Sequence, residues 1–267
     1  MRRLNPVHRR RELVEAGGAR LDVIVEGEGP AIVLLPSSLR DSEDFDGLAQ
    51  LLAGEGFLVL RPQPRGMGRS SDPQTGMTLE TLADDVAAVI AQLADGPAIV
   101  AGHAYGHWVA RITDLRHPDN VRGVVLVAAG ARDMPAHLRE QLAIASDPGH
   151  AEQDRLQALR ACMFAPGHDA RAWLTGWHPR WRQAYAQARQ HPPMDTWFAR
   201  AHAPILDLQA AQDPWRPPAT RNEVADAVDV PVTVQVIADA SHALVPEQPA
   251  AVASAIATWA RALDNRR

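Results

Sequence analysis

Hydrophobic positions in the first half of the chain form short continuous runs rather than an alternating pattern. The runs are rich in Val, Ile and Leu and are bounded by Gly or Pro, which predicts β-strands. The predicted strands are Leu21–Val25, Ala31–Leu35, Phe57–Leu60, Ala98–Ala101 and Val121–Ala129. Because most of them lack polar alternation, we expect strands that are buried on both faces, as in a mainly parallel sheet.

Between these runs, apolar residues recur at the three- and four-residue spacing of amphipathic helices. The predicted helices are Asp44–Leu52, Thr78–Leu93 and Ala104–Arg116. In the second of them, Thr78 and Thr81 offer side chains that can cap the first turn. Repeated strand–helix alternation predicts an α/β fold with a doubly wound sheet.

The pattern changes after Gly130, because residues 131–202 are polar, helical in spacing and contain no predicted strand. This stretch carries four tryptophans: Trp173, Trp177, Trp181 and Trp197. Alternation then resumes with Pro204–Gln209, Pro231–Ile237 and a closing helix over Pro249–Leu263. We therefore predict a core of residues 1–130 and 203–267, and a helical cap or lid over residues 131–202. A helical elaboration that only packs on the core is the alternative.

Composition narrows the possible partners. The length of 267 residues suits one such domain, and a net charge of −5 leaves no basic surplus for nucleic-acid phosphates. The sequence contains no run of 18 apolar residues, so no membrane span is predicted. With a single cysteine, Cys162, and no apolar stretch after the N-terminal arginines, we expect a cytoplasmic protein. No phosphate-binding glycine motif and no Cys/His cluster occurs, so we expect a small-molecule partner and no cofactor or metal. The oligomeric state cannot be predicted.

One short motif is a candidate for the reactive part of a functional site. The segment Gly102-His103-Ala104-Tyr105-Gly106 ends a predicted strand and begins a predicted helix. A strained strand-to-helix turn needs small neighbours where backbones approach closely. Three other segments accompany it: the loop Pro62–Ser70 with the sequence PQPRGMGRS, Asp213 just after a predicted strand, and His242 after the last predicted strand.

Together these segments resemble the α/β-hydrolase fold superfamily, whose nucleophile elbow is G-x-S-x-G in the same strand–turn–helix context. The resemblance covers essentially the whole chain outside residues 131–202. In particular, G-H-A-Y-G is similar to the elbow of a bacterial subgroup of α/β-hydrolases that has Ala in place of the elbow serine. The resemblance implies that Ala104 occupies the nucleophile position, with Asp213 and His242 as the acid and histidine of the triad. Asp133 is the alternative acid, in which case Asp213 only caps a helix.

The resemblance also implies an oxyanion hole and a pocket. The backbone N–H groups of Tyr105 and Ser38 are the expected donors, with Ser37 as the fallback. A tryptophan-bearing lid predicts a largely apolar pocket. Its candidate lining residues are Trp177, Trp181 and Trp215, for each of which packing in the core is the competing interpretation. His103 and His107 are expected to be structural.

Because a methyl group has no lone pair, no acyl-enzyme can form on Ala104. Three explanations stay open: a natural alanine, an engineered Ser-to-Ala change that traps substrate, or another nucleophile such as Ser37, Ser38 or Tyr105. With a natural alanine, we expect His242 and Asp213 to activate water for hydrolysis of a small apolar ester or related carbonyl compound. The alternatives are a lyase, an isomerase or a cofactor-free oxygenase with His242 as base, and a non-catalytic protein that binds a small ligand.

Overall fold

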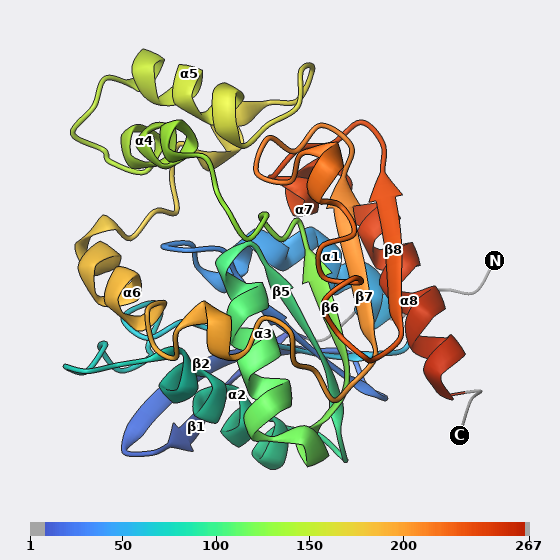
Figure 1. Ribbon diagram of the computed structural model, residues 1–267. Helices are drawn as coiled ribbons and strands as arrows, with labels where there is room; N and C mark the ends of the chain where they lie inside the picture. Colours follow the sequence, from blue (N-terminus) through green and yellow to red (C-terminus); the bar gives the residue numbers. More distant parts are fainter. Residues whose placement is uncertain (1–8, 265–267) are drawn as a thin grey trace.

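A single eight-stranded sheet organises residues 9–264, the part of the chain that this computed structural model describes (Figure 1). The strand order is β1-β2-β4-β3-β5-β6-β7-β8. The strands are β1 Arg10–Ala16, β2 Ala19–Glu26, β3 Ala31–Leu35, β4 Leu58–Pro62, β5 Ala98–His103, β6 Val121–Val127, β7 Ile205–Ala210 and β8 Val232–Ile237. Pairs β1–β2 and β2–β4 are antiparallel and all others are parallel, which confirms the predicted mainly parallel sheet. Residues 1–8 and 265–267, predicted as core, lie outside the described residues.

Helices cover both faces of the sheet, as a doubly wound fold requires (Figure 1). Helices α2 (Leu79–Leu93) and α3 (Tyr105–Arg116) pack on one face, and α1 (Asp46–Gly54) and α8 (Pro249–Asp264) pack on the other. The predicted cap of α2 is present, since Thr78 and Thr81 form a reciprocal capping box. No helix within residues 9–264 is long and apolar enough to cross a membrane.

The sequence pattern did not predict strand β1. Its residues Arg10, Arg11 and Glu12 are exposed or half-buried, because β1 is an edge strand that pairs only with β2. A strand with one face in solvent lacks the continuous apolar run that marked the buried strands.

Residues 131–202, called here the inserted segment, connect β6 to β7 beyond the carboxyl ends of the parallel strands (Figure 1). The segment contains α4 (Ala136–Ala145), α5 (Glu152–Cys162), the short helix α6 (Arg182–Ala188) and several 3₁₀ turns. Its apolar side chains, including Leu138, Leu159 and Trp173, form a small cluster that also takes in Trp215. The inserted segment therefore packs on the loop that follows β7.

One arginine ties the inserted segment to the loop after β3. The Arg40 guanidinium carbon lies 4.7 Å from the ring centroids of both Trp173 and Trp177. The same side chain donates to the carboxylate of Asp44 and, at 2.6 Å, to the carbonyl oxygen of Thr175. Since Arg40 is buried, these contacts combine ring stacking with hydrogen bonds from all three of its guanidinium nitrogens. The loop that carries Ser37 and Ser38 is thereby fixed against the inserted segment.

Candidate active site

Ala104 occupies a strained turn between β5 and α3. Its φ of +46° and ψ of −116° fall in a region that residues other than glycine rarely adopt. Glycines on either side make this turn possible. A Cβ atom at Gly102 would lie 2.2 Å from the carbonyl carbon of Gly106, and a Cβ atom at Gly106 would lie 2.3 Å from the Leu35 carbonyl oxygen. The G-x-x-x-G spacing is therefore required by close backbone contact.

The same close contact brings the first turn of α3 beside the loop after β3. That loop turns at Leu39, which has a φ of +61°, and the turn is closed by a 3.2 Å hydrogen bond from the Arg40 N–H to the Ser37 carbonyl. Among the described residues, neither the Tyr105 N–H nor the Ser38 N–H has a backbone or side-chain acceptor, and both residues line one cavity. Tyr105 also begins α3, where the helix dipole favours negative charge. Two donors are thus available to an oxyanion.

Asp213 and His242 lie in contact within this site. The His242 Nδ1 atom is 2.9 Å from one carboxylate oxygen of Asp213, whose other oxygen accepts the Trp215 N–H at 2.8 Å. Because the ionised carboxylate only accepts, Nδ1 carries the proton and Nε2 is left as the basic nitrogen. The alternative acid, Asp133, is exposed and forms no hydrogen bond with His242 among the described residues.

Two further histidines donate hydrogen bonds to the backbone of site residues. The Nε2 atom of His103 donates to the His242 carbonyl oxygen at 2.7 Å, and Nδ1 of His107 donates to the Ala104 carbonyl oxygen. Burial lowers the pKa of each imidazole to about 3. Both rings are therefore neutral near pH 7, and their contacts hold the backbone on the two sides of the site.

A cavity of about 150 Å³ opens over Ala104. The expected site residues that line it are Ala104, Tyr105, Ser38, His242, Trp177 and Trp215. Asp213 lies behind His242 and is not part of this lining. Trp181 is the one expected lining residue that is absent, because its indole N–H donates to the Gly66 carbonyl at 2.9 Å. A Cβ atom at Gly66 would lie 2.2 Å from the Trp181 Nε1 atom, so this tryptophan packs on the Pro62–Ser70 loop instead.

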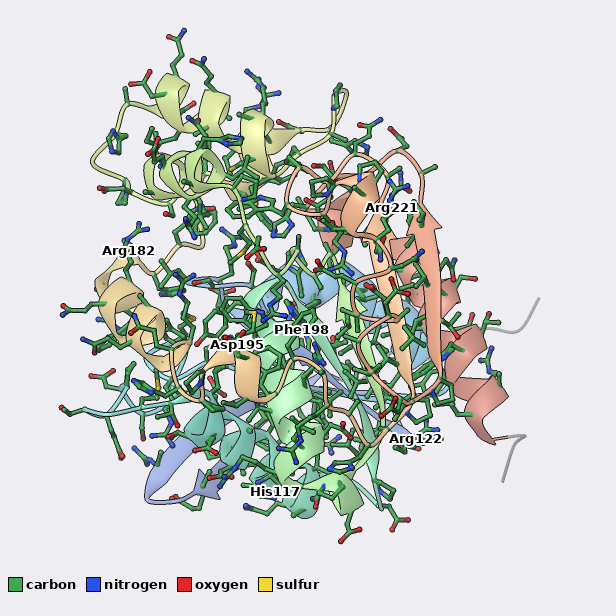
Figure 2. All side chains as sticks on the ribbon, viewed as in Figure 1. His117, Arg122, Arg182, Asp195, Phe198 and Arg221 are labelled. Atoms are coloured by element: carbon green, nitrogen blue, oxygen red, sulfur yellow. The ribbon has the colours of Figure 1, made fainter. Side chains whose placement is uncertain are left out.

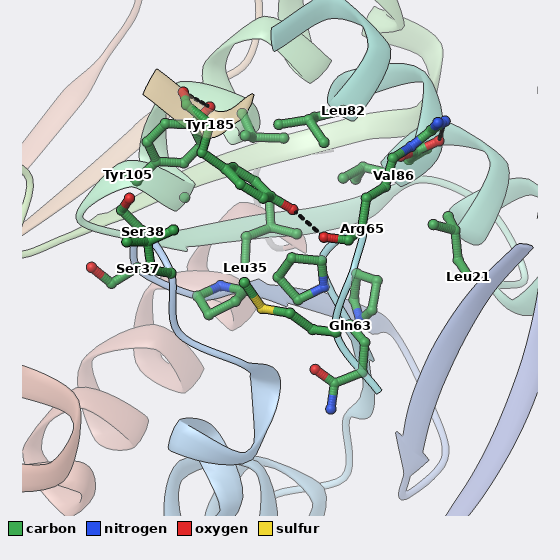
Figure 3. A pocket seen from close by; sticks show the side chains of 18 residues that line it. Leu21, Leu35, Ser37, Ser38, Gln63, Arg65, Leu82, Val86, Tyr105 and Tyr185 are labelled. Carbon is green, nitrogen blue, oxygen red and sulfur yellow. Dashed lines mark hydrogen bonds and ion pairs between the residues drawn. The ribbon is translucent and has the colours of Figure 1, made fainter. Parts of the chain in front are cut away.

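A second, smaller cavity of about 60 Å³ shares Ser37, Ser38, Tyr105 and Tyr185 with the first (Figure 3). In it, the Tyr105 hydroxyl donates to the Tyr185 carbonyl at 3.4 Å, and the Tyr185 hydroxyl donates to the Arg65 carbonyl at 2.9 Å. Burial raises the pKa of Tyr105 above its ordinary value. A phenol that resists ionisation and already donates to a carbonyl is a poor replacement nucleophile.

The Pro62–Ser70 loop has a structural role in the described contacts. The Gln63 side chain accepts the Ser42 N–H at 3.1 Å and donates to Glu43. The Ser70 hydroxyl donates to the Gln63 carbonyl at 2.8 Å and accepts the Asp22 N–H at 2.9 Å. These bonds attach the loop to β2 and to the segment before α1.

The sequence analysis missed three arginines of the inserted segment that line the larger cavity: Arg139, Arg182 and Arg189. Most of the lining is apolar, as expected, and includes Trp108, Leu142 and Trp177, but the arginines were not foreseen. All 27 basic residues of the chain are arginines, so composition gives no signal that singles out these three. These three arginines are recognised only from the packing of α4 and α6 around one cavity.

The elbow contact predicts a large difference between two glycine substitutions. Gly106→Ala forces the Leu35 carbonyl to move, and overpacking of this kind costs about 1–3 kcal/mol. Gly47→Ala in α1 is the control, because the nearest atom to its added Cβ is 4.0 Å away and alanine favours a helix by up to about 1 kcal/mol. Urea unfolding should show a loss of stability for Gly106→Ala only. Equal midpoints for Gly106→Ala and the unaltered chain would contradict the contact.

The buried His103 predicts a specific loss of stability in acid. Unfolded histidine takes up a proton as pH falls below 6.5, whereas folded His103 stays neutral until about pH 3. The protonation of His103 therefore leaves the free energy of unfolding unchanged above pH 6.5 and lowers it as the pH falls below 6.5. At pH 5 this difference costs the folded state about 2 kcal/mol.

Urea unfolding at pH 7.5 and pH 5 measures this effect. The unaltered chain should lose about 2 kcal/mol more than His103→Asn between the two pH values. His150→Asn, at an exposed position, is the control and should lose as much as the unaltered chain. Parallel losses in all three proteins would show that His103 is not held neutral.

Comparisons with known proteins identify relatives that are similar in sequence or in structure. The chain is 33% identical over 114 residues to the 2-(acetamidomethylene)succinate hydrolase of Mesorhizobium japonicum, a match over 43% of this chain and 41% of that enzyme. It is 27% identical over 201 residues to the zearalenone hydrolase of Bionectria ochroleuca, a match over 69% of each. The enol-lactonase structure from Burkholderia xenovorans aligns with a TM-score of 0.78 at 22% identity, over 94% of this chain and 100% of that one.

The family model of the alpha/beta hydrolase fold matches residues 30–194. This range is more than half of the chain and contains Ala104, while Asp213 and His242 lie beyond it. The sheet order, the strained turn after β5 and this match agree. The chain belongs to the alpha/beta hydrolase fold family.

Proposed function

We propose that this protein hydrolyses a small ester or related carbonyl compound without a covalent intermediate. His242, oriented by Asp213, takes a proton from a water molecule whose oxygen bonds to the substrate's carbonyl carbon. The N–H groups of Tyr105 and Ser38 stabilise the resulting oxyanion. The bond from that carbon to the leaving oxygen then breaks, and His242 returns the proton to the leaving group.

The observation that carries this proposal is the position of the His242–Asp213 pair beside a methyl group. His242 and Ala104 line the same cavity, and Asp213 holds Nδ1 of the imidazole at 2.9 Å. This geometry supports His242 as the base of a site in which the side chain that would attack the substrate is absent. A water molecule in place of a serine hydroxyl has polar partners there in His242 and the two N–H groups.

The other nucleophiles weighed from the sequence are less well supported. Tyr105 is partly buried, and its hydroxyl donates to the Tyr185 carbonyl oxygen. Within the described residues, neither the Ser37 nor the Ser38 hydroxyl forms a hydrogen bond with His242. Serine is a weak nucleophile unless a base removes its proton. Water activated by His242 is therefore the favoured attacking group.

The relatives support hydrolysis as the reaction type. Two enzymes with matching sequences are named as hydrolases, one of 2-(acetamidomethylene)succinate and one of zearalenone. Both matches are partial, so we take from them the class of reaction and leave the substrate to experiment.

The first test is turnover of 4-nitrophenyl acetate and 4-nitrophenyl butanoate. We expect slow but catalytic release of 4-nitrophenol by the unaltered chain, and a loss of roughly 10²–10⁴-fold in kcat/KM for His242→Ala, since that is what a general base contributes. His150→Ala is the matched control at an exposed histidine and should keep the full rate. Progress curves should show no initial burst, because no acyl-enzyme accumulates.

Two outcomes would contradict the proposal. Equal rates for the unaltered chain and His242→Ala would remove the histidine from the reaction. Turnover at enzyme-like rates by Ala104→Ser alone would mean that the site is built for serine chemistry, with Ala104 as a loss of function.

A further inference from the structure

Three cations converge on the cavity over Ala104. Arg139 lies within α4, Arg182 begins α6 and Arg189 directly follows α6, and all three line this cavity. Among the described residues that line it, none is Asp or Glu. The reactive groups come from the edge of the sheet, whereas all of the positive charges come from the inserted segment. The cavity therefore has a reactive side and a cationic side.

These three arginines differ in their polar partners from several buried arginines elsewhere in the molecule. Arg61, Arg65 and Arg216 each form an ion pair with a buried carboxylate. Arg182 instead extends from α6 towards α4 and donates to the Ser146 hydroxyl at 2.9 Å (Figure 2).

The remaining two have no carboxylate partner in the described part of the chain. The Arg189 guanidinium carbon lies 5.9 Å from the Trp108 ring centroid, and the Arg139 side chain forms no hydrogen bond or ion pair with another residue of 9–264. Arg139 and Arg189 are both exposed, so they are hydrated at the cavity mouth. Their charges are not neutralised by the protein.

We propose that this cavity selects a substrate that carries a carboxylate in addition to the carbonyl group that reacts. Arg139, Arg182 and Arg189 bind the carboxylate, since guanidinium groups match its geometry and attract it through the cavity mouth. The carbonyl group then lies over Ala104 beside His242. This inference rests on the proposed function and adds the substrate class.

The size of the cavity supports a short molecule. A cavity of about 150 Å³ accepts a ligand about as large as benzene. The walls between the two polar sides are apolar, with Trp108, Leu142 and Trp177 among them. A short aliphatic chain that joins an ester to a carboxylate fits this distribution of groups.

Two esters that differ in one group test the preference. Methyl hydrogen succinate carries a carboxylate where methyl butanoate carries a methyl group, and their hydrolysis can be followed by proton NMR. We expect kcat/KM to favour the succinate by roughly tenfold or more, because each exposed ion pair contributes modestly and three act together. The advantage should shrink as NaCl is added, since salt screens exposed charges.

Variants of the arginines identify the binding groups. The triple variant Arg139→Gln, Arg182→Gln and Arg189→Gln should lose the preference, while the corresponding triple Lys variant should keep most of it. Arg160→Gln, on the exposed part of α5 and outside the cavity lining, is the control and should behave as the unaltered chain. Thermal melting confirms that each variant folds. No preference in the unaltered chain, or an unchanged preference in the triple Gln variant, would overturn the proposal.

A binding measurement separates this inference from the proposed function. Isothermal titration with succinate, its neutral analogue succinamide and inorganic phosphate needs no turnover. Binding of succinate alone, lost in the triple Gln variant, supports the carboxylate site even if neither ester is hydrolysed. Failure of succinate to bind, or equal binding of phosphate, would overturn the assignment to a carboxylate.

Discussion

The contact between the Gly106 backbone and the carbonyl oxygen of Leu35 is the constraint on which the site depends. It leaves no room for a side chain at Gly106 and presses the first turn of α3 against the loop after β3. In this turn Ala104 has a φ of +46°, and it lines the cavity. The same approach brings the N–H groups of Tyr105 and Ser38 to one cavity. The two N–H groups that we propose as oxyanion donors thus depend on backbone packing and not on the side chain of residue 104.

The Asp213–His242 pair is held by contacts that do not involve the side chain of Ala104. Burial of a carboxylate is unfavourable unless hydrogen bonds compensate it, and Asp213 has two such bonds, from Trp215 and His242. The second bond fixes the histidine tautomer, and His103 holds the backbone of the same residue. Loss of the hydroxyl leaves this arrangement intact. What changes is the attacking group, which we assign to water.

The sequence predicted most of the sheet and the elbow, because both depend on local patterns. Buried strands are continuous apolar runs, and the G-x-x-x-G spacing reports a backbone contact that only glycine permits. It did not predict β1, whose outer face meets solvent, or the packing of Trp181, which depends on Gly66 more than a hundred residues earlier. The sequence analysis also did not predict the cationic side of the cavity. Arg139 and Arg189 come together only through the tertiary arrangement of α4 and α6.

The most direct test of the account is the mass of the intact protein, quenched in acid during steady-state turnover of 4-nitrophenyl acetate. The sequence contains no lysine, so little background acetylation is expected. The account predicts that the chain keeps its unmodified mass during turnover, whereas Ala104→Ser, as the positive control, gains one acetyl group. One acetyl group on the unaltered chain, located by peptide mapping to Ser37 or Ser38, would show that a protein nucleophile and not water attacks the substrate.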